Sequence, residues 1–226
     1  IKAVENFKKV IELTPDNTRG YNLLGTAYFY LYNLPQAIQM TEKALSIKPT
    51  WMVYNNLGTF YFLERRYSDA VRAFEQAVEM GNKIPATWGN LADAYRHVPE
   101  LKDKAKPAYE EAINLARQAL TQNPKDFDLL RRLARYHSYL GFREEALAEI
   151  QQARQLAPQN ALVLESSVEA YEIIGEREEA LRALEEMVRA EGSLQMIVLS
   201  PDLESLRSDP QYAAIMKGVK GIPALK

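Results

Sequence analysis

The sequence contains no cysteine and only two histidines among its 226 residues. The missing cysteines exclude a disulfide framework, a thiolate metal site and a cysteine nucleophile. Its 28 basic and 30 acidic residues leave a net charge of −2, which argues against wholesale nucleic-acid binding. No apolar run approaches the roughly 18–20 residues that a membrane span requires, so we expect no membrane insertion of this chain.

The first residues, Ile1-Lys2-Ala3-Val4, contain no Met and no signal-peptide pattern. This start predicts that the chain is a piece of a longer protein. The compartment is left open by the sequence, with the cytoplasm slightly favoured, because fusion to a sensor with a membrane span would place the chain elsewhere.

A repeat of about 33 residues is the most informative feature that is present. An aromatic residue, a Leu, a small residue and a Tyr recur in that order, beginning at Tyr21, Tyr54 and Trp88 and, with changes, at Leu130 and Leu164. Each is followed by a second pattern of Ala, a bulky residue and Ala, as at Ala70, Phe74 and Ala77. Both patterns have helical spacing, so each unit predicts a pair of amphipathic helices in which small residues permit close packing.

This pattern resembles the tetratricopeptide repeat family over about residues 1–192. The resemblance implies an all-α fold, a right-handed superhelix of antiparallel helix pairs whose first helices line a concave groove. The predicted boundaries are a half motif at 1–17, motifs at about 18–50, 51–84, 85–125, 127–159 and 161–192, and a C-terminal capping segment at 193–226.

Departures from the repeat carry further predictions. The half motif lacks its first helix, which would deprive Val4, Phe7 and Ile11 of a packing partner. Seven extra residues between Ala112 and Pro124 predict a long second helix at about 106–122, which either offers a distinct face or is a plain spacer.

After residue 192 the repeat fades, and two Pro residues behind capping side chains predict two short helices within 201–217 that cover the last repeat. Residues 202–210 resemble the closing segments of repeat arrays in bacterial multi-domain signalling proteins, fused to kinases, nucleotide cyclases or DNA-binding regulators.

Catalytic patterns have little support. His137 stands where other units place Tyr, which favours a packing role, and His97 lies at the end of a first helix. There is no Gly-rich phosphate loop, His-x-x-x-His pair or nucleophile elbow. We therefore expect no enzyme, no metal and no cofactor, and only an anionic small molecule on the arginines described next would revive an enzyme hypothesis.

Projection of the first helices predicts which side chains face the groove. These candidates for partner binding are Asn22, Asn55, Asn56, Thr59, Phe62, Asn90, Asp93, Arg131, Arg132 and Arg135. Asn56 and Asn90 share one motif position, where an amide can either clamp a peptide backbone or bond a neighbouring helix. The three arginines either bind carboxylate or phosphate, or are neutralised by the row Glu165, Glu169 and Glu172.

Some family members clamp acidic chaperone tails with Lys, Asn and Arg side chains, but only Asn90 and Arg132 match that set, so we do not predict such binding. The leading hypothesis is a protein-interaction module that binds an extended or helical peptide segment in the groove. The alternative is a structural spacer or self-association scaffold within a signalling protein. The expected partner is thus a protein or peptide, or a second copy of the chain, and not a nucleic acid.

Overall fold

The computed structural model describes residues 2–80 and 83–219. Within these ranges the chain is built from α-helices and short 3-10 helices, with no strand, which confirms the predicted all-α class. The chain divides into two compact units, residues 1–108 and residues 109–226, called unit 1 and unit 2 below.

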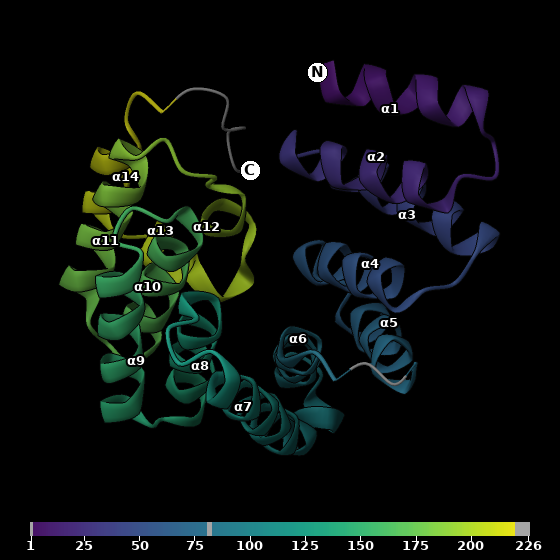
Figure 1. The fold of residues 1–226 in the computed structure, drawn as a ribbon. Coiled ribbons are helices and arrows are strands. Elements are labelled where there is room, and N and C mark those ends of the chain that lie inside the picture. The colour runs from purple at the N-terminus through teal and green to yellow at the C-terminus, as the bar shows by residue number, and fades with distance from the viewer. Residues whose placement is uncertain (1, 81–82, 220–226) are drawn as a thin grey trace. The chain divides into compact units, whose positions relative to one another are not determined.

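The described residues of unit 1 form six α-helices, one 3-10 helix and the start of a further α-helix (Figure 1). They are α1 (Lys2–Leu13), α2 (Thr18–Tyr30), α3 (Leu34–Ile47), α4 (Trp51–Leu63), α5 (Tyr67–Glu79), α6 (Pro85–Arg96), the 3-10 helix η1 (Pro99–Lys104) and the beginning of α7 (Ala105–Gln122). Asn17, Asn33 and Thr50 cap the N-termini of α2, α3 and α4, each accepting a backbone N–H with its side chain. These polar caps fix where the helices begin.

Close helix packing in unit 1 depends on small residues, as the repeat predicts. Successive helices from α1 to α6 pack against one another. A Cβ on Gly25 would overlap Thr41 Oγ1 and lie 2.9 Å from the Ala37 carbonyl oxygen, and one on Gly58 would lie 2.7 Å from the Phe74 ring. The glycines of the motif therefore set how closely the two helices of a pair approach.

The repeated Tyr of the first helices joins neighbouring pairs. The Tyr61 hydroxyl donates to Glu42 Oε1 at 2.5 Å, and the Tyr95 hydroxyl donates to Glu75 Oε1 at 2.8 Å. Each bond links a first helix to the second helix before it. Burial and the Glu42 bond raise the pKa of Tyr61 to about 12, so this hydroxyl keeps its proton and remains a donor.

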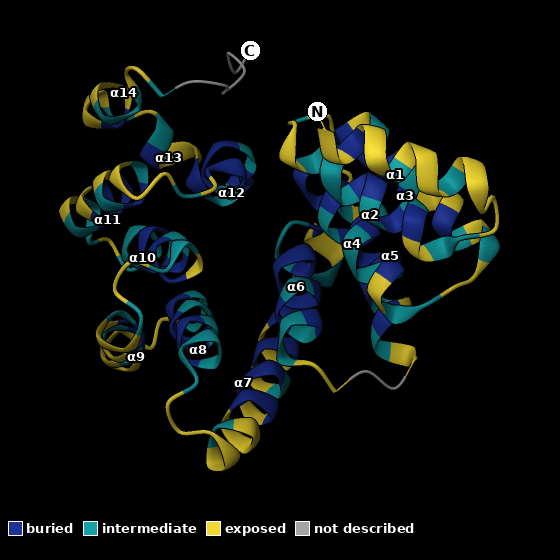
Figure 2. Ribbon diagram, turned by 45° about the horizontal axis from the view of Figure 1, so that its top comes forward, coloured by how far each residue is buried: buried dark blue, intermediate teal, exposed yellow. Residues whose placement is uncertain are grey.

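Unit 2 continues the alternation of first and second helices, with buried residues on the facing sides (Figure 2). It holds most of α7, α8 (Phe127–Leu140), α9 (Arg143–Leu156), α10 (Ala161–Ile173) and α11 (Arg177–Arg189). Gly141 and Gly175 adopt φ values of 78° and 84° after α8 and α10, a left-handed conformation that favours glycine. α8 packs against both α9 and α10, and α10 packs against α11.

The C-terminal segment is more helical than predicted. It forms α12 (Gln195–Leu199), the 3-10 helix η2 (Pro201–Leu203), α13 (Glu204–Arg207) and α14 (Pro210–Met216). Ile197 and Leu206 are fully buried, and α14 packs against α11. The sequence analysis missed α12, although the two proline-led helix starts agree with the structure. The end of the predicted capping segment, residues 220–226, lies outside the described residues.

The long second helix is present as α7, whose 18 residues exceed the length of every other described helix.

At the N-terminus, α1 buries Val4 but leaves Val10 38% and Leu13 83% exposed, while Phe7 and Ile11 are half-buried. None of the helices in the described ranges combines the length and apolarity that crossing a bilayer would need.

Candidate functional site

Four asparagines of unit 1 form two side-chain hydrogen bonds between first helices. Asn56 Nδ2 donates to Asn22 Oδ1 at 3.1 Å, which joins α4 to α2. Asn90 Nδ2 donates to Asn55 Oδ1 at 3.2 Å, which joins α6 to α4. We call these four residues the amide ladder.

The amide ladder follows from the repeat register. Each donor lies one residue before the motif Leu of its helix, and each acceptor lies two residues before the motif Leu of the preceding first helix. Asn22 is buried, whereas Asn55, Asn56 and Asn90 are half-buried. The Oδ1 atoms of Asn56 and Asn90 and the Nδ2 atom of Asn55 take no part in the ladder and retain hydrogen-bonding capacity.

The other candidates of unit 1 are either hydrogen-bonded within their own helix or buried. Thr59 Oγ1 donates to the Asn55 carbonyl at 3.0 Å, and this bond uses its only proton. Phe62 is 7% exposed and its ring lies edge-on to Tyr67 and His97, at centroid distances of 5.6 and 5.2 Å. Asp93 is 6% exposed. Phe62 and Asp93 are therefore largely enclosed by neighbouring residues.

The three arginines of unit 2 are all engaged by side chains of the same unit. Arg131 is 5% exposed, and it donates from Nε to Asp128 Oδ1 at 2.8 Å and from Nη1 to Ser166 Oγ at 3.1 Å. Arg132 Nε donates to Asp128 Oδ2 at 2.9 Å. Arg135 Nε lies 3.0 Å from Glu169 Oε1.

The expected glutamate row takes only part of this role. Glu169 pairs with Arg135, but Asp128, one turn away on the same helix, pairs with Arg131 and Arg132. Glu172 instead pairs with Arg177, whose Nη2 lies 2.6 Å from Glu172 Oε1. Asp128 pairs with Arg131 and Arg132 because residues three and four apart on one helix lie on the same face.

Burial and charge act in opposite directions on the acids of this cluster. Burial alone would raise the pKa of Asp128, but Arg132 and Arg131 outweigh it and hold the pKa below its ordinary value. Burial raises the pKa of Glu165 to about 7 in spite of the nearby guanidinium of Arg131. Asp128 is thus a fixed anion, whereas Glu165 titrates near neutral pH.

Tyr139 connects three elements of unit 2. Its hydroxyl lies 2.7 Å from Glu169 Oε1 on α10 and 2.8 Å from Asp202 Oδ2 on η2, and its ring stacks on Tyr109 at a centroid distance of 5.5 Å. Sequence reasoning missed Asp202, because no repeat register relates it to Tyr139. The capping pattern at Ser200-Pro201-Asp202 located the turn without indicating its partner.

His137 is buried in unit 2 at the position of the repeated Tyr. It is 2% exposed, its Nδ1 lies 2.6 Å from Glu149 Oε2, and its Nε2 lies 3.4 Å from Arg117 Nη2. The imidazole lines a pocket of about 420 Å³ together with Phe142. Among the residues that the structure describes, no three His, Asp or Glu side chains gather as metal ligands would.

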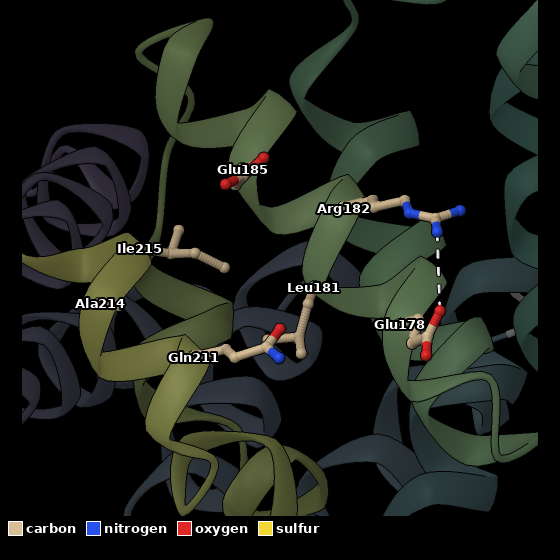
Figure 3. Close-up of a pocket in the computed structure, with 7 residues that line it drawn as sticks. All are labelled: Glu178, Leu181, Arg182, Glu185, Gln211, Ala214 and Ile215. Atoms are coloured by element: carbon tan, nitrogen blue, oxygen red, sulfur yellow. Dashed lines mark ion pairs between the residues drawn. The ribbon is translucent and has the colours of Figure 1, made fainter.

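A second pocket, of about 510 Å³, lies between α11 and α14 (Figure 3). Leu181 and Ile215 point into it, and charged residues of α11 surround it, including Arg182, which pairs with Glu178 at 3.6 Å. No pattern in the sequence indicated this pocket, because it depends on how α14 docks against α11.

Comparison with known proteins supports the resemblance drawn from the repeat. Residues 52–84 match the family model described as tetratricopeptide repeat. Over 111 residues the chain is 25% identical to tetratricopeptide repeat protein 13 from Homo sapiens. This alignment covers 49% of this chain and 13% of that protein. Over 78 residues the chain is 25% identical to Hsp70-Hsp90 organizing protein 2 from Arabidopsis thaliana. This alignment covers 34% of this chain and 14% of that protein. The aligned part spans only a small fraction of either relative.

Solved structures show the same fold. The thermophilic TPR protein TTC0263 of Thermus thermophilus has a TM-score of 0.60 and 20% identity, over 88% of this chain and 99% of that chain. The APC/C hetero-tetramer Cut9-Hcn1 contains a chain with a TM-score of 0.62 and 14% identity, over 96% of this chain and 38% of that chain. The fold is therefore an all-α superhelical repeat fold of the tetratricopeptide type.

Proposed function

We propose that this chain is a protein-interaction module that binds an extended or helical peptide segment on the faces of its first helices. The observation that carries the proposal is the amide ladder of unit 1. Its unused atoms are a donor and an acceptor on α4 and an acceptor on α6, and the N–H and C=O groups of an extended peptide can bond to both kinds of atom. Tetratricopeptide repeat proteins generally mediate protein–protein interactions, which supports the same class of function.

The proposal does not extend to chaperone tails, despite the printed name of the plant relative. A two-carboxylate clamp needs free cationic side chains. Here Asp128 stands at one of the expected lysine positions and binds Arg132, the cation that does match. An acidic tail would therefore meet a neutralised site.

We further propose that the chain works without catalysis, as part of a larger multi-domain protein, with a bacterial signalling protein as the proposed context. The resemblance of residues 202–210 to closing segments of such arrays supports this setting. A second candidate function is self-association or spacing. The exposed Val10 and Leu13 of α1 favour it, because apolar side chains on a helix face are commonly covered by another helix.

Selection from a phage-displayed library of random peptides tests peptide binding directly. The immobilised chain should enrich a peptide family, and calorimetry with a synthetic member should give its affinity. Joint Asn55→Ala and Asn90→Ala substitution should weaken that affinity, whereas Gln39→Ala, which removes an exposed amide from α3, should not. Equal affinities for all three proteins would contradict the proposed face. Self-association would instead be favoured if light scattering gave a molar mass that rises with protein concentration, and if this rise were absent in the Leu13→Ser variant.

A further inference from the structure

The first-helix faces of the two units differ in what their polar groups already bind. We infer that peptide recognition is confined to unit 1, that its ligand is an uncharged extended segment held through main-chain groups, and that the matching face of unit 2 is a closed structural surface. This inference rests on the proposed function and narrows it to one part of the chain and one ligand chemistry.

The face of unit 2 is closed by a bridge across three elements. One phenol hydroxyl, that of Tyr139, reaches both Glu169 on α10 and Asp202 on η2. The neighbours of this bridge are scarcely exposed: 5% for Arg131, 13% for the Arg135 side chain and 16% for the Glu169 side chain. A peptide that used these groups would have to replace the bonds that already join α8, α10 and η2.

The C-terminal segment that completes this bridge is anchored by its own core. Leu203 is 2% exposed and Ile197 is fully buried, and η2 packs directly against α10. Arg207 also donates from Nη1 to the Ile197 carbonyl at 3.0 Å. Displacing residues 195–207 would expose these apolar side chains to water, so the segment is a permanent part of unit 2.

The arginines of unit 2 are equally unsuited to capture an anion. Asp128 uses both carboxylate oxygens, one on Arg131 and one on Arg132, and Arg131 also reaches Ser166. An anionic ligand would have to replace these intramolecular pairs and leave Asp128 among its neighbours without a counter-ion. The guanidinium groups thus hold α8 and α10 together instead of presenting a recognition site.

Unit 1 offers the opposite chemistry. The amide ladder is uncharged, three of its four residues are half-buried, and its bonds leave acceptors on Asn56 and Asn90 and a donor on Asn55. Amides recognise the peptide group itself without selecting a charged side chain. Binding through such groups depends little on ionic strength, because screening acts on charges.

The repeat register explains why the ladder ends at α6. The ladder acceptor stands two residues before the motif Leu, and in α6 that position is Gly89, which has no side chain. In α8 the two ladder positions before Leu133 are Arg131 and Arg132. The change from amides to ion pairs therefore coincides with the change from unit 1 to unit 2.

A photo-crosslinking experiment on the whole chain tests this assignment. A peptide enriched from the random library is synthesised with a benzoylphenylalanine at its centre, irradiated with the chain, and located by mass spectrometry of tryptic fragments. We expect crosslinks within residues 18–96. We also expect Asn55→Ala with Asn90→Ala to weaken binding about tenfold, the loss of two modest hydrogen bonds. Arg132→Gln and a change from roughly 50 to 500 mM NaCl should each change affinity less than about twofold.

The outcomes separate this inference from the function on which it rests. Crosslinks within residues 127–173, or a steep salt dependence of affinity, would overturn the confinement to unit 1 while peptide binding itself stood. A library that yields no binder would remove the proposed function and this inference with it. Crosslink position does not depend on any substitution, so a poorly folded variant cannot obscure the result.

Discussion

The hydroxyl of Tyr139 lies within hydrogen-bonding distance of two carboxylates, at 2.8 Å from Asp202 and 2.7 Å from Glu169. One proton serves two acceptors that come from different helices, 63 and 30 residues away in sequence. This single side chain joins a first helix, the next first helix and the C-terminal segment. It is therefore a sensitive point for the stability of unit 2.

Tyr139→Phe should lower the free energy of unfolding by about 1–3 kcal/mol, because it removes the donor that lies between two partly buried carboxylates. Urea denaturation followed by circular dichroism measures the change. Tyr171→Phe is the matched control, since the Tyr171 hydroxyl on α10 makes no hydrogen bond within the described chain. Equal losses in the two variants would show that the bridge contributes nothing specific.

Glu165→Gln should change how stability depends on pH. The pKa of Glu165 is raised from its ordinary value of 4.5 to about 7 by burial. The folded chain therefore keeps a proton that the unfolded chain loses, and stability falls as pH rises from about 4.5 to about 7. The total loss corresponds to about 3 kcal/mol.

The Glu165→Gln variant removes this titration, so it should be less pH-sensitive than wild type in that window and more stable at pH 8. Unfolding midpoints across pH 4–8 measure it. Arg131, Arg132, Arg135 and Glu169 act on the charge of Glu165 and are present in both proteins, so the difference between the two pH profiles reports the loss of the titrating group at position 165. Glu178→Gln, with an 87% exposed side chain, is the control, and an unaltered pH profile in Glu165→Gln would refute the prediction.

Gly25→Ala should destabilise unit 1 more than Gly141→Ala destabilises unit 2. A Cβ at Gly25 would overlap Thr41 Oγ1 and press on the backbone oxygen of Ala37, which cannot move alone. We expect a loss of about 1–3 kcal/mol. A Cβ at Gly141 meets no atom within 4 Å but must adopt a φ of 78°, at about 1 kcal/mol. Thermal unfolding compares the two, and the reverse order would contradict the close approach of α2 and α3.

Arg177→Met should loosen the C-terminal segment. Arg177 pairs with Glu172, whose side chain is 8% exposed, and also reaches Asp209 at 3.2 Å and the Ser205 carbonyl at 3.2 Å. The substitution leaves Glu172 without its cation, so we expect a loss of about 2 kcal/mol or more. Amide hydrogen exchange should accelerate in residues 195–209. The control is Arg182→Met, because the Arg182 side chain is 63% exposed and its loss should leave that exchange unaltered. Equal exchange rates of residues 195–209 in the two variants would contradict the prediction.

Much of the fold was predictable because the same helix-pair pattern recurs along most of the chain. Helical spacing around Leu57 and Phe74, the small residues Gly25 and Gly58, and the extra residues before Pro124 all predict features that the structure contains. The short helix α12 was missed because its five residues are too few to show a helical period.

The candidate site was only partly predictable. The register placed Asn22, Asn55, Asn56 and Asn90 on one type of face, but the pairing of Asn56 with Asn22 emerged only from the packing of α4 against α2. The arginines were identified, yet the structure shows Asp128 as the partner of two of them. A side chain has several acceptors within reach along its helix and across to the next, and sequence spacing does not rank them.

The sequence by itself determined the helix pairs, their repeat length and the small residues that let them approach, since these depend on local periodicity and residue size. Only the tertiary structure decided that Tyr139 meets Asp202, that His137 takes Glu149 as its partner, and that Asp128 neutralises Arg131 and Arg132. The physical reason is that hydrogen bonds and ion pairs depend on ångström-scale distances between helices. Those distances result from the packing of the whole unit.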